Sequence, residues 1–405
     1  MSSDTSNMLY KHYRYLLELV KAAVNETAAI KPPLDVSWGK IYQLASETMF
    51  SCPVFYAVST LPPNTVPRSI YEKLFVDFQK SVSQDAERAK FLNLMTDFCE
   101  EEKIDIMLLK GSCLREFYPQ AEMRYMIDAD ILIHDCDSEK IDAFLIRRGF
   151  ILRSPGEIHD EYVCKRTGII VEIHKKLVSE ENRAASFFNL EMTGRARPYS
   201  GYRFVKMLTV EDQYIYLIDH TAKHFYGSGI TPRMILDFYV FYKKFAEEID
   251  WEALSEKLVP LHYKTFERRL RVLAQEWFSP EGAGVRKDAF SLYVLQNGCF
   301  GRNKNLYVSR AVRESKEDAP PSKIKYVLRR LFPSFKMLRG KFPILEKRPY
   351  LTPLMFFPWW ATWFDTLFIK KKLDYKTLKH VNDIDRESTD NLRTLYEEME
   401  LDYRR

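Results

Sequence analysis

Two aspartates interrupt an otherwise apolar segment at residues 127–133, and this segment constrains the fold more than any other. Residue type alternates with a period of two, which predicts a β-strand with Asp128 and Asp130 on one face and apolar side chains on the other. Two like charges this close repel each other and are costly to bury. A divalent cation removes both costs, and carboxylate oxygens are the ligands that Mg²⁺ prefers. The segment therefore predicts a strand with a metal site on its polar face.

A turn of distinctive composition lies shortly before this strand. The mainly apolar residues 104–109 predict a first strand, and Lys110, Gly111 and Ser112 follow it directly. We expect this turn to open a helix over residues 111–117, whose N-terminal N–H groups favour an anion such as phosphate. A metal site next to a phosphate site is the arrangement that phosphoryl or nucleotidyl transfer requires.

A third acid lies on a later apolar segment, residues 169–174, which is interrupted by Glu172. A lone glutamate within such a segment needs a partner, and a shared metal site supplies one. Two aspartates on a strand are, by themselves, often only the solvated edge of a sheet. The combination of the aspartates, the Lys-Gly-Ser turn and Glu172 favours the metal site.

This order of motifs resembles the polymerase-β-type nucleotidyltransferase superfamily and, more narrowly, the uncharacterised bacterial nucleotidyltransferase family. The resemblance covers about residues 40–370, and it departs from the wider superfamily in the long gap between Ser112 and Asp128. The matching positions are Lys110-Gly111, Tyr118-Pro119, Arg124, Asp128, Asp130, Glu172, His174, 209–213, His220, His224, Arg233, Asp237, 298–301, 331–333 and 348–351.

The resemblance implies an α+β fold with a nucleotidyltransferase core, a mixed sheet with helices on one side, flanked by helical N-terminal and C-terminal regions. It implies that Asp128, Asp130 and Glu172 hold two Mg²⁺ ions, with Mn²⁺ as a substitute, against a nucleoside triphosphate such as ATP. One of these acids would accept the proton of an acceptor hydroxyl, and pyrophosphate would leave.

Further residues are candidates for contacts with the substrates. Gly111 and Ser112 would hold the β and γ phosphates, and Arg124 would neutralise charge on the leaving pyrophosphate. Lys110 has the same predicted role, and the alternative is a surface lysine at the end of a strand. His174 follows Glu172 by two residues, so it points the same way and would orient that acid or contact the acceptor.

The pattern of elements predicts four parts: residues 1–101, 102–205, 206–310 and 311–405. The first is a helical region, with helices over 10–24, 38–51 and 70–101, the last capped by Ser69. The second is the catalytic core, in which Ser138 caps a helix through Arg148 and strands 161–165 and 169–174 form a hairpin. The third is a helical domain that covers the cleft, and the fourth is a basic and aromatic helical segment with a tail.

Two pairs of polar residues lie on predicted helices of the third part. His220 and His224 are four residues apart, opposite the apolar stripe of a helix that Thr209 caps. They have three interpretations: they line the cleft, they are solvated, or they bind zinc. Arg233 and Asp237 lie on a helix that begins at Thr231 and Pro232, and a helix-internal ion pair is the simplest explanation for them.

Composition restricts the class of protein. A net charge of +5 over 405 residues does not indicate a nucleic-acid binder, although it does not exclude one. The six cysteines lack the paired spacing of a metal site, and residues 1–7 lack the features of a signal peptide. We therefore expect a cytoplasmic protein with reduced thiols.

The C-terminal part has an uneven composition. Residues 323–348 contain nine Lys or Arg and one acid, and residues 350–369 are rich in Trp and Phe. This combination is typical of a peripheral membrane segment, here over residues 323–372, at the inner membrane surface. Prolines and Asp365 disfavour a spanning helix. The alternative, which we favour, is a buried segment with the aromatic residues as core.

Three classes of function remain open for this chain. The first is an enzyme that transfers a nucleotide to a hydroxyl-bearing acceptor, for example in glycan or cell-surface metabolism. The second is a toxin-like or regulatory enzyme that nucleotidylates tRNA or protein. The third is a silent binding protein that kept the fold, which the intact set of three acids disfavours. The sequence does not identify the acceptor.

Overall fold

The computed structural model describes residues 3–134, 137–180, 182–188, 196–298, 303–314, 332–342, 344–364 and 386–403. The chain forms two compact units. The first comprises Met1–Lys223 and Ile230–Cys299, and the second comprises His224–Gly229 and Phe300–Arg405. The finer division into four parts stays a prediction.

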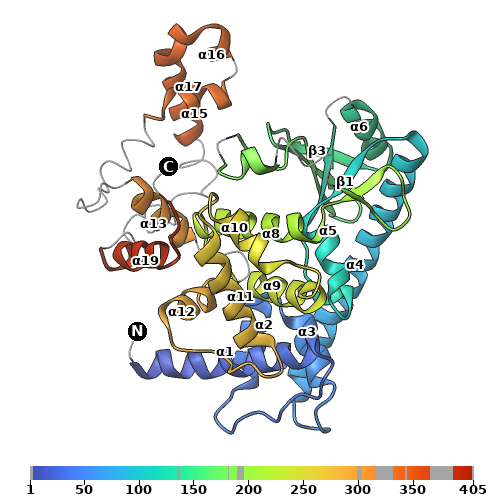
Figure 1. Ribbon diagram of the computed structural model, residues 1–405, viewed down its shortest axis with the longest axis vertical. Coiled ribbons are helices and arrows are strands. Elements are labelled where there is room, and N and C mark those ends of the chain that lie inside the picture. The colour runs from blue at the N-terminus through green and yellow to red at the C-terminus, as the bar shows by residue number, and fades with distance from the viewer. Residues whose placement is uncertain are drawn as a thin grey trace. The chain divides into compact units, whose positions relative to one another are not determined.

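The first unit contains a seven-stranded mixed sheet with the strand order β3-β4-β5-β2-β1-β7-β6 (Figure 1). Strand β2 pairs in parallel with β5 and antiparallel with β1, and β3, β4 and β5 form an antiparallel meander. The predicted mixed sheet of an α+β core is confirmed. The strands are β1 (Ile106–Leu108), β2 (Asp128–Ile133), β3 (Phe150–Ser154), β4 (His159–Cys164), β5 (Ile170–His174), β6 (Arg197–Pro198) and β7 (Val205–Met207).

One face of the sheet packs on two helices, α4 (Arg68–Glu102) and α6 (Ser138–Arg147). The alternating residues of β2 and β5 supply this face, and Ala129, Ile131 and Val171 are fully buried there. They contact Phe91 and Met95 of α4 within the same apolar cluster. Burial of a side chain such as Ile or Val contributes about 1.5–3 kcal/mol to the free energy of unfolding. The apolar face of each strand is therefore held against the helices, and the opposite face is left for polar groups.

The N-terminal helices differ from the prediction in two places. The predicted helix 38–51 is two helices, α2 (Trp38–Thr48) and α3 (Ser51–Val58), because Met49 takes a left-handed conformation. The helix α3 includes Pro53, which the first turn tolerates because the N–H that proline lacks has no intrahelical partner there. Ser69 does not cap α4, since that helix begins at Arg68 after Pro67. The helix α1 (Ser3–Val24) ends at the predicted residue but begins seven residues before the predicted start at Tyr10.

The remaining helices of the first unit begin near the predicted caps. Thr209 precedes α8 (Val210–Phe225), and its hydroxyl accepts a hydrogen bond from the Asp212 N–H at 3.2 Å. Pro232 is the first residue of α9 (Pro232–Phe245), as predicted. Asp137, not Ser138, occupies the cap position of α6. The other elements are α5 (Lys110–Leu114), η1 (Arg115–Phe117), η2 (Ala121–Met123), α10 (Trp251–Leu258), α11 (Lys264–Phe278) and α12 (Ala289–Leu295).

The second unit is helical in its described residues. Tyr396 connects its parts, because the Tyr396 hydroxyl lies 2.9 Å from both Ser309 Oγ and the carbonyl oxygen of Phe225. Most of the predicted linker 308–322 and most of the basic segment before residue 332 lie outside the described residues. The helices are α13 (Asn303–Glu314), α15 (Phe335–Lys341), α16 (Ile344–Lys347), η4 (Pro349–Leu351), α17 (Thr352–Phe364) and α19 (Arg386–Glu398).

The aromatic residues of α17 do not form a buried core in the described part of the chain. Phe332, Phe356 and Trp360 pack on one another, with ring centroids 5.6–6.0 Å apart. Tyr350 and Phe357, however, are 72% and 65% exposed. The favoured interpretation of this segment as core is therefore wrong for these residues. Among the helices that the structure describes, none is long and apolar enough to cross a membrane.

Candidate active site

The structure brings the three predicted acids to one face of the sheet. Asp130 on β2 is the register partner of Glu172 on β5, and Asp128 lies two residues earlier on the same face as Asp130. The opposite face of both strands is the apolar one that packs on α4 and α6. We call the face that carries Asp128, Asp130, Glu172 and His174 the acid face. Parallel pairing of two strands distant in sequence is what assembles it.

The carboxylates interact strongly with one another. Burial, together with the nearby charges of Asp130 and Glu172, raises the pKa of Asp128 to about 6. Asp130 is only 3% exposed, and burial alone would raise its pKa. Lys110 and His174 outweigh burial, so the pKa of Asp130 lies well below its ordinary value. The cations of the site therefore offset the cost of burying the negative charge of Asp130 but not that of Asp128.

Lys110 is part of this site and is not a surface lysine. Its Nζ lies 3.2 Å from Asp130 Oδ1 and 5.9 Å from the centroid of the Tyr216 ring on α8. Burial disfavours the ammonium group, but the nearby carboxylates outweigh burial and raise the pKa of Lys110. Its backbone φ is +38°, a conformation that costs a side-chain-bearing residue about 1–3 kcal/mol. The strained backbone of Lys110 therefore lies where its side chain contacts Asp130.

The turn after Lys110 is packed tightly against the chain. Ser112 is buried, its N–H donates to the Leu109 carbonyl at 3.1 Å, and its hydroxyl donates to the Asp130 carbonyl at 3.4 Å. A Cβ atom on Gly111 would lie 2.8 Å from Arg124 Nη1, so a larger residue would require that guanidinium to shift. The predicted phosphate contacts of Gly111 and Ser112 stay a prediction. For Ser112 they would require the hydroxyl to leave its bond to Asp130.

Arg124 and Asp237 form a buried pair in place of the predicted Arg233–Asp237 pair. Arg124 Nε and Nη2 donate to the two oxygens of Asp237 at 2.8 and 3.0 Å, and the Tyr118 hydroxyl donates to Oδ1 at 2.7 Å. Arg233 instead donates to the Tyr125 carbonyl at 2.6 Å. The helix-internal pair is wrong because Arg124, from a distant loop, satisfies both oxygens of Asp237 in a fork geometry.

The two histidines of α8 fall in different places. His220 lies close enough to the acids that its charge contributes to lowering the pKa of Asp130. His224 belongs to the second unit. The interpretation of His220 as a residue that lines the cleft therefore gains support, and the role of His224 stays a prediction.

His159 on β4 belongs to the site, and the sequence analysis missed it. It is the register partner of His174 on β5, and the two ring centroids lie 5.0 Å apart. Its Nε2 lies 3.7 Å from Glu172 Oε1. The signal was present in the sequence, because the hairpin across residues 166–168 fixes which residue of the first strand faces His174. Burial lowers the pKa of His159 below its ordinary value.

The donor set fits a divalent cation. Three carboxylates converge on one face, and burial together with repulsion among them raises the pKa of Asp128. A bound cation would relieve that repulsion, and Mg²⁺ takes one or two carboxylates together with phosphate oxygens. The residues present are therefore those that a metal–nucleotide complex needs.

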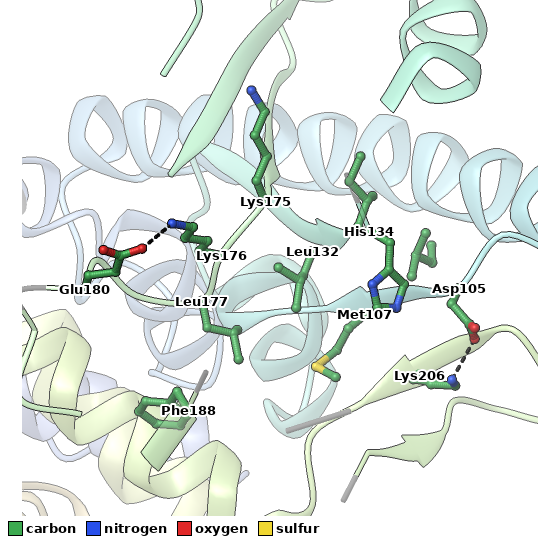
Figure 2. Close-up of a pocket in the computed structure, with 12 residues that line it drawn as sticks. Asp105, Met107, Leu132, His134, Lys175, Lys176, Leu177, Glu180, Phe188 and Lys206 are labelled. Atoms are coloured by element: carbon green, nitrogen blue, oxygen red, sulfur yellow. Dashed lines mark hydrogen bonds and ion pairs between the residues drawn. The ribbon is translucent and has the colours of Figure 1, made fainter. Parts of the chain in front are cut away.

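A pocket of about 400 Å³ is lined in part by residues that follow the acids along β2 and β5, and none of Asp128, Asp130, Glu172 and His174 lines it (Figure 2). Leu132, two residues after Asp130, and Lys175, directly after His174, both line it. Its rim carries the ion pairs Lys206–Asp105 at 2.6 Å and Lys176–Glu180 at 2.7 Å. Its apolar lining comes from Ile106, Met107, Leu132, Ile133, Leu177 and Phe188. A pocket of this size and composition is typical of a small-molecule site.

A mixed sheet with three acids on its open face, beside a buried lysine, defines a nucleotidyltransferase core. The chain belongs to the uncharacterised nucleotidyltransferase family, whose sequence pattern matches residues 35–279. The predicted resemblance is thereby confirmed, and the family supports nucleotidyl transfer as the general activity.

The chain was also compared with solved structures and with curated proteins. It is similar to the solution structure of the antibiotic-resistance factor ANT(2'')-Ia, with 11% sequence identity and a TM-score of 0.33. The similarity covers 46% of this chain and 97% of that one. The sequence matches no curated protein.

Proposed function

We propose that this protein is a metal-dependent nucleotidyltransferase that moves a nucleoside monophosphate from a nucleoside triphosphate to a hydroxyl-bearing acceptor. The observation that carries the proposal is the alignment of Asp130 with Glu172 across two parallel strands, with Asp128 on the same face. The acceptor oxygen forms a bond to the α-phosphorus, the bond to the bridging oxygen breaks, and pyrophosphate leaves. One of the three carboxylates accepts the proton of the acceptor hydroxyl.

We assign different roles to the residues of the site. A divalent cation held by Asp128, Asp130 and Glu172 would neutralise the triphosphate and lower the pKa of the acceptor hydroxyl. Lys110 presents an ammonium group at the same place and attracts phosphate oxygens. Arg124 supports the turn at Gly111 through its bond to Asp237, so we assign it a positioning role rather than direct contact with pyrophosphate.

We further propose that the acceptor occupies the pocket of Figure 2. The lining of the pocket includes Leu132, two residues after Asp130, and Lys175, directly after His174. An apolar floor below a rim of charged residues suits a small molecule with an apolar part and polar substituents. Such an acceptor fits the first of the three function classes, transfer to a small molecule.

Nucleotide binding that depends on a divalent metal is the expected result for the wild-type protein. Isothermal titration with ATP, GTP, CTP and UTP should give a measurable affinity for at least one nucleotide in the presence of Mg²⁺. The affinity should fall at least about tenfold when the metal is removed by a chelator, because the carboxylates then repel the triphosphate. The nucleotide that binds most tightly identifies the donor.

The same titration separates the proposal from its competitor. If no nucleotide binds with or without Mg²⁺, the protein is better explained as a silent scaffold that kept the fold. Binding that is equally tight in chelator would contradict the metal site while leaving nucleotide recognition intact. Mn²⁺ in place of Mg²⁺ should restore binding, since both accept carboxylate ligands.

We also propose that the segment 332–364 contacts an anionic membrane surface. Lys341 lies 4.9 Å from the centroid of the Trp359 ring, so basic and aromatic groups are interleaved there. In its described residues, Glu346 is the single acid, beside exposed Arg339, Lys341, Lys347 and Arg348. Interfacial segments combine these residue types. The exposed apolar side chains are Phe332, Phe335, Met337, Ile344, Tyr350, Leu354 and Phe357.

Sedimentation with lipid vesicles tests this contact. The protein should pellet with vesicles that contain about one third anionic phosphatidylglycerol and should not pellet with neutral vesicles. Leu354→Ser combined with Phe357→Ser should reduce the pelleted fraction severalfold, because each replacement removes apolar area that enters the interface. Ile146→Ser, at a residue of similar exposure on α6, is the matched control and should bind like the wild type. Equal binding by the double variant would rule out this surface.

A further inference from the structure

The cluster of His159, Glu172 and His174 combines two imidazoles with one of the three predicted carboxylates. These residues lie on two neighbouring strands, β4 and β5, and each offers one ligand atom. The three ligand atoms lie within 4.8 Å of one another. We propose that this cluster binds a divalent transition-metal ion of the kind that accepts imidazole ligands, such as Zn²⁺, at a position that adjoins the oxygen-ligated site at Asp128 and Asp130.

The distances fit coordination of one ion. Ligand atoms about 2.1 Å from a tetrahedral metal lie about 3.4 Å from each other. The structure has 3.3 Å between His174 Nε2 and Glu172 Oε2, and 3.7 Å between His159 Nε2 and Glu172 Oε1. Small rotations of the carboxylate and of the His159 ring would complete the set. Two imidazoles and one carboxylate leave a coordination position for water or substrate, as in catalytic zinc sites.

The scaffold holds the ligands in place. His159 and His174 are register partners across the antiparallel β4–β5 pair, and Glu172 lies two residues before His174 on the same face. The His174 side chain is 4% exposed, and its buried Nδ1 has no hydrogen-bond partner. Its contacts therefore all involve Nε2, the atom that faces Glu172 and Asp130. His159 is 35% exposed and gives an ion access from solvent.

The chemistry of the donors decides which ion binds. Mg²⁺ takes oxygen ligands and binds imidazole poorly, whereas Zn²⁺ and related ions bind imidazole well. Glu172 belongs to both sets, so its carboxylate would connect the two positions. This inference does not rest on nucleotide transfer, because the cluster would bind the ion whatever the acid face does with nucleotides.

Titration of the full-length, chelator-treated protein with Co²⁺ tests the proposal. Co²⁺ bound by imidazoles in a four- or five-coordinate site absorbs visible light far more strongly than Co²⁺ in water, so the spectrum reports the ligands directly. The wild type should show these bands, and their intensity should reach a plateau as Co²⁺ is added. His159→Ala should weaken this binding at least about tenfold and abolish the bands. Zn²⁺ should displace the Co²⁺ and its bands, and Mg²⁺ should not.

Two control variants separate this site from its neighbours. His134→Ala, at an exposed histidine at the end of β2, should leave the bands unchanged. Asp128→Asn removes an acid of the oxygen-ligated site and should also leave the bands unchanged, while metal-dependent nucleotide binding is lost. Circular dichroism must show that His159→Ala is folded, as expected for a partly exposed residue. The proposal would be overturned if His159→Ala bound Co²⁺ with the same affinity and the same bands as the wild type. It would also be overturned if the spectrum of the wild type lacked the imidazole bands.

Discussion

Replacement of Asp130 by asparagine is expected to abolish nucleotide transfer while the protein stays folded. The change removes one negative ligand from the acid face but keeps the shape and one acceptor oxygen for Lys110 and His174, which lie 3.2 and 3.0 Å away. Charge stabilisation by a metal contributes several kcal/mol to a transition state, and each ~1.4 kcal/mol is about tenfold in rate. We therefore expect a loss of at least about a thousandfold.

The measurement is the rate of pyrophosphate release from the nucleotide that the titrations identify, with water or an added alcohol as acceptor. Asp142→Asn is a suitable control, because Asp142 lies on α6 and accepts a hydrogen bond from the Tyr162 hydroxyl away from the acid face. That variant should retain activity within about twofold. Turnover by Asp130→Asn at the wild-type rate would remove the proposed mechanism, provided that circular dichroism shows both variants folded.

Removal of the Asp237 carboxylate is expected to cause the largest loss of stability. Three donors from Arg124 and Tyr118 converge on it, and the Arg124 and Asp237 side chains are only 8% and 4% exposed. Asp237→Ala would leave the Arg124 guanidinium buried without its anion. Breaking a buried ion pair in this way costs about 3–5 kcal/mol of unfolding free energy.

Urea unfolding followed by circular dichroism measures this loss. Tyr118→Phe removes one of the three donors and should cost about 1 kcal/mol. Arg68→Ala breaks the exposed Arg68–Glu72 pair on α4 and should leave the urea midpoint unchanged, which shows that burial and not pairing is decisive. A midpoint for Asp237→Ala equal to that of the wild type would mean that the pair contributes nothing to the fold.

Sequence patterns predicted those parts of the site that depend on local periodicity. The alternation in residues 127–133 and the apolar segment 169–174 were enough to place Asp128, Asp130 and Glu172 on strands, where a side chain has only two directions. The parallel register that sets Asp130 against Glu172 then follows from burying both apolar faces on α4 and α6. Family resemblance supplied the functional class, and the pattern of the family confirms it.

The contacts that were not predicted are those between distant segments. Arg124 and Asp237 are separated by 113 positions, and nothing local distinguishes Arg124 from Arg233 as the partner of Asp237. His159 was missed because the first three residues of strand β4 are all polar and give no alternation, so the predicted strand began only at residue 161. The helix α3 was also not predicted, although Pro53 occupies its first turn, where a proline is tolerated.

The parallel pairing of β2 with β5 also has a consequence for the order of folding. His174 and Asp130 are in contact across 44 positions of the chain, so the segment that contains α6, β3 and β4 must close into a loop before the acids can meet. Contacts of this kind form late, because long loops must close first. An ion on the acid face would act as a crosslink that exists only in the finished sheet. It would slow unfolding of the native chain without hastening its formation.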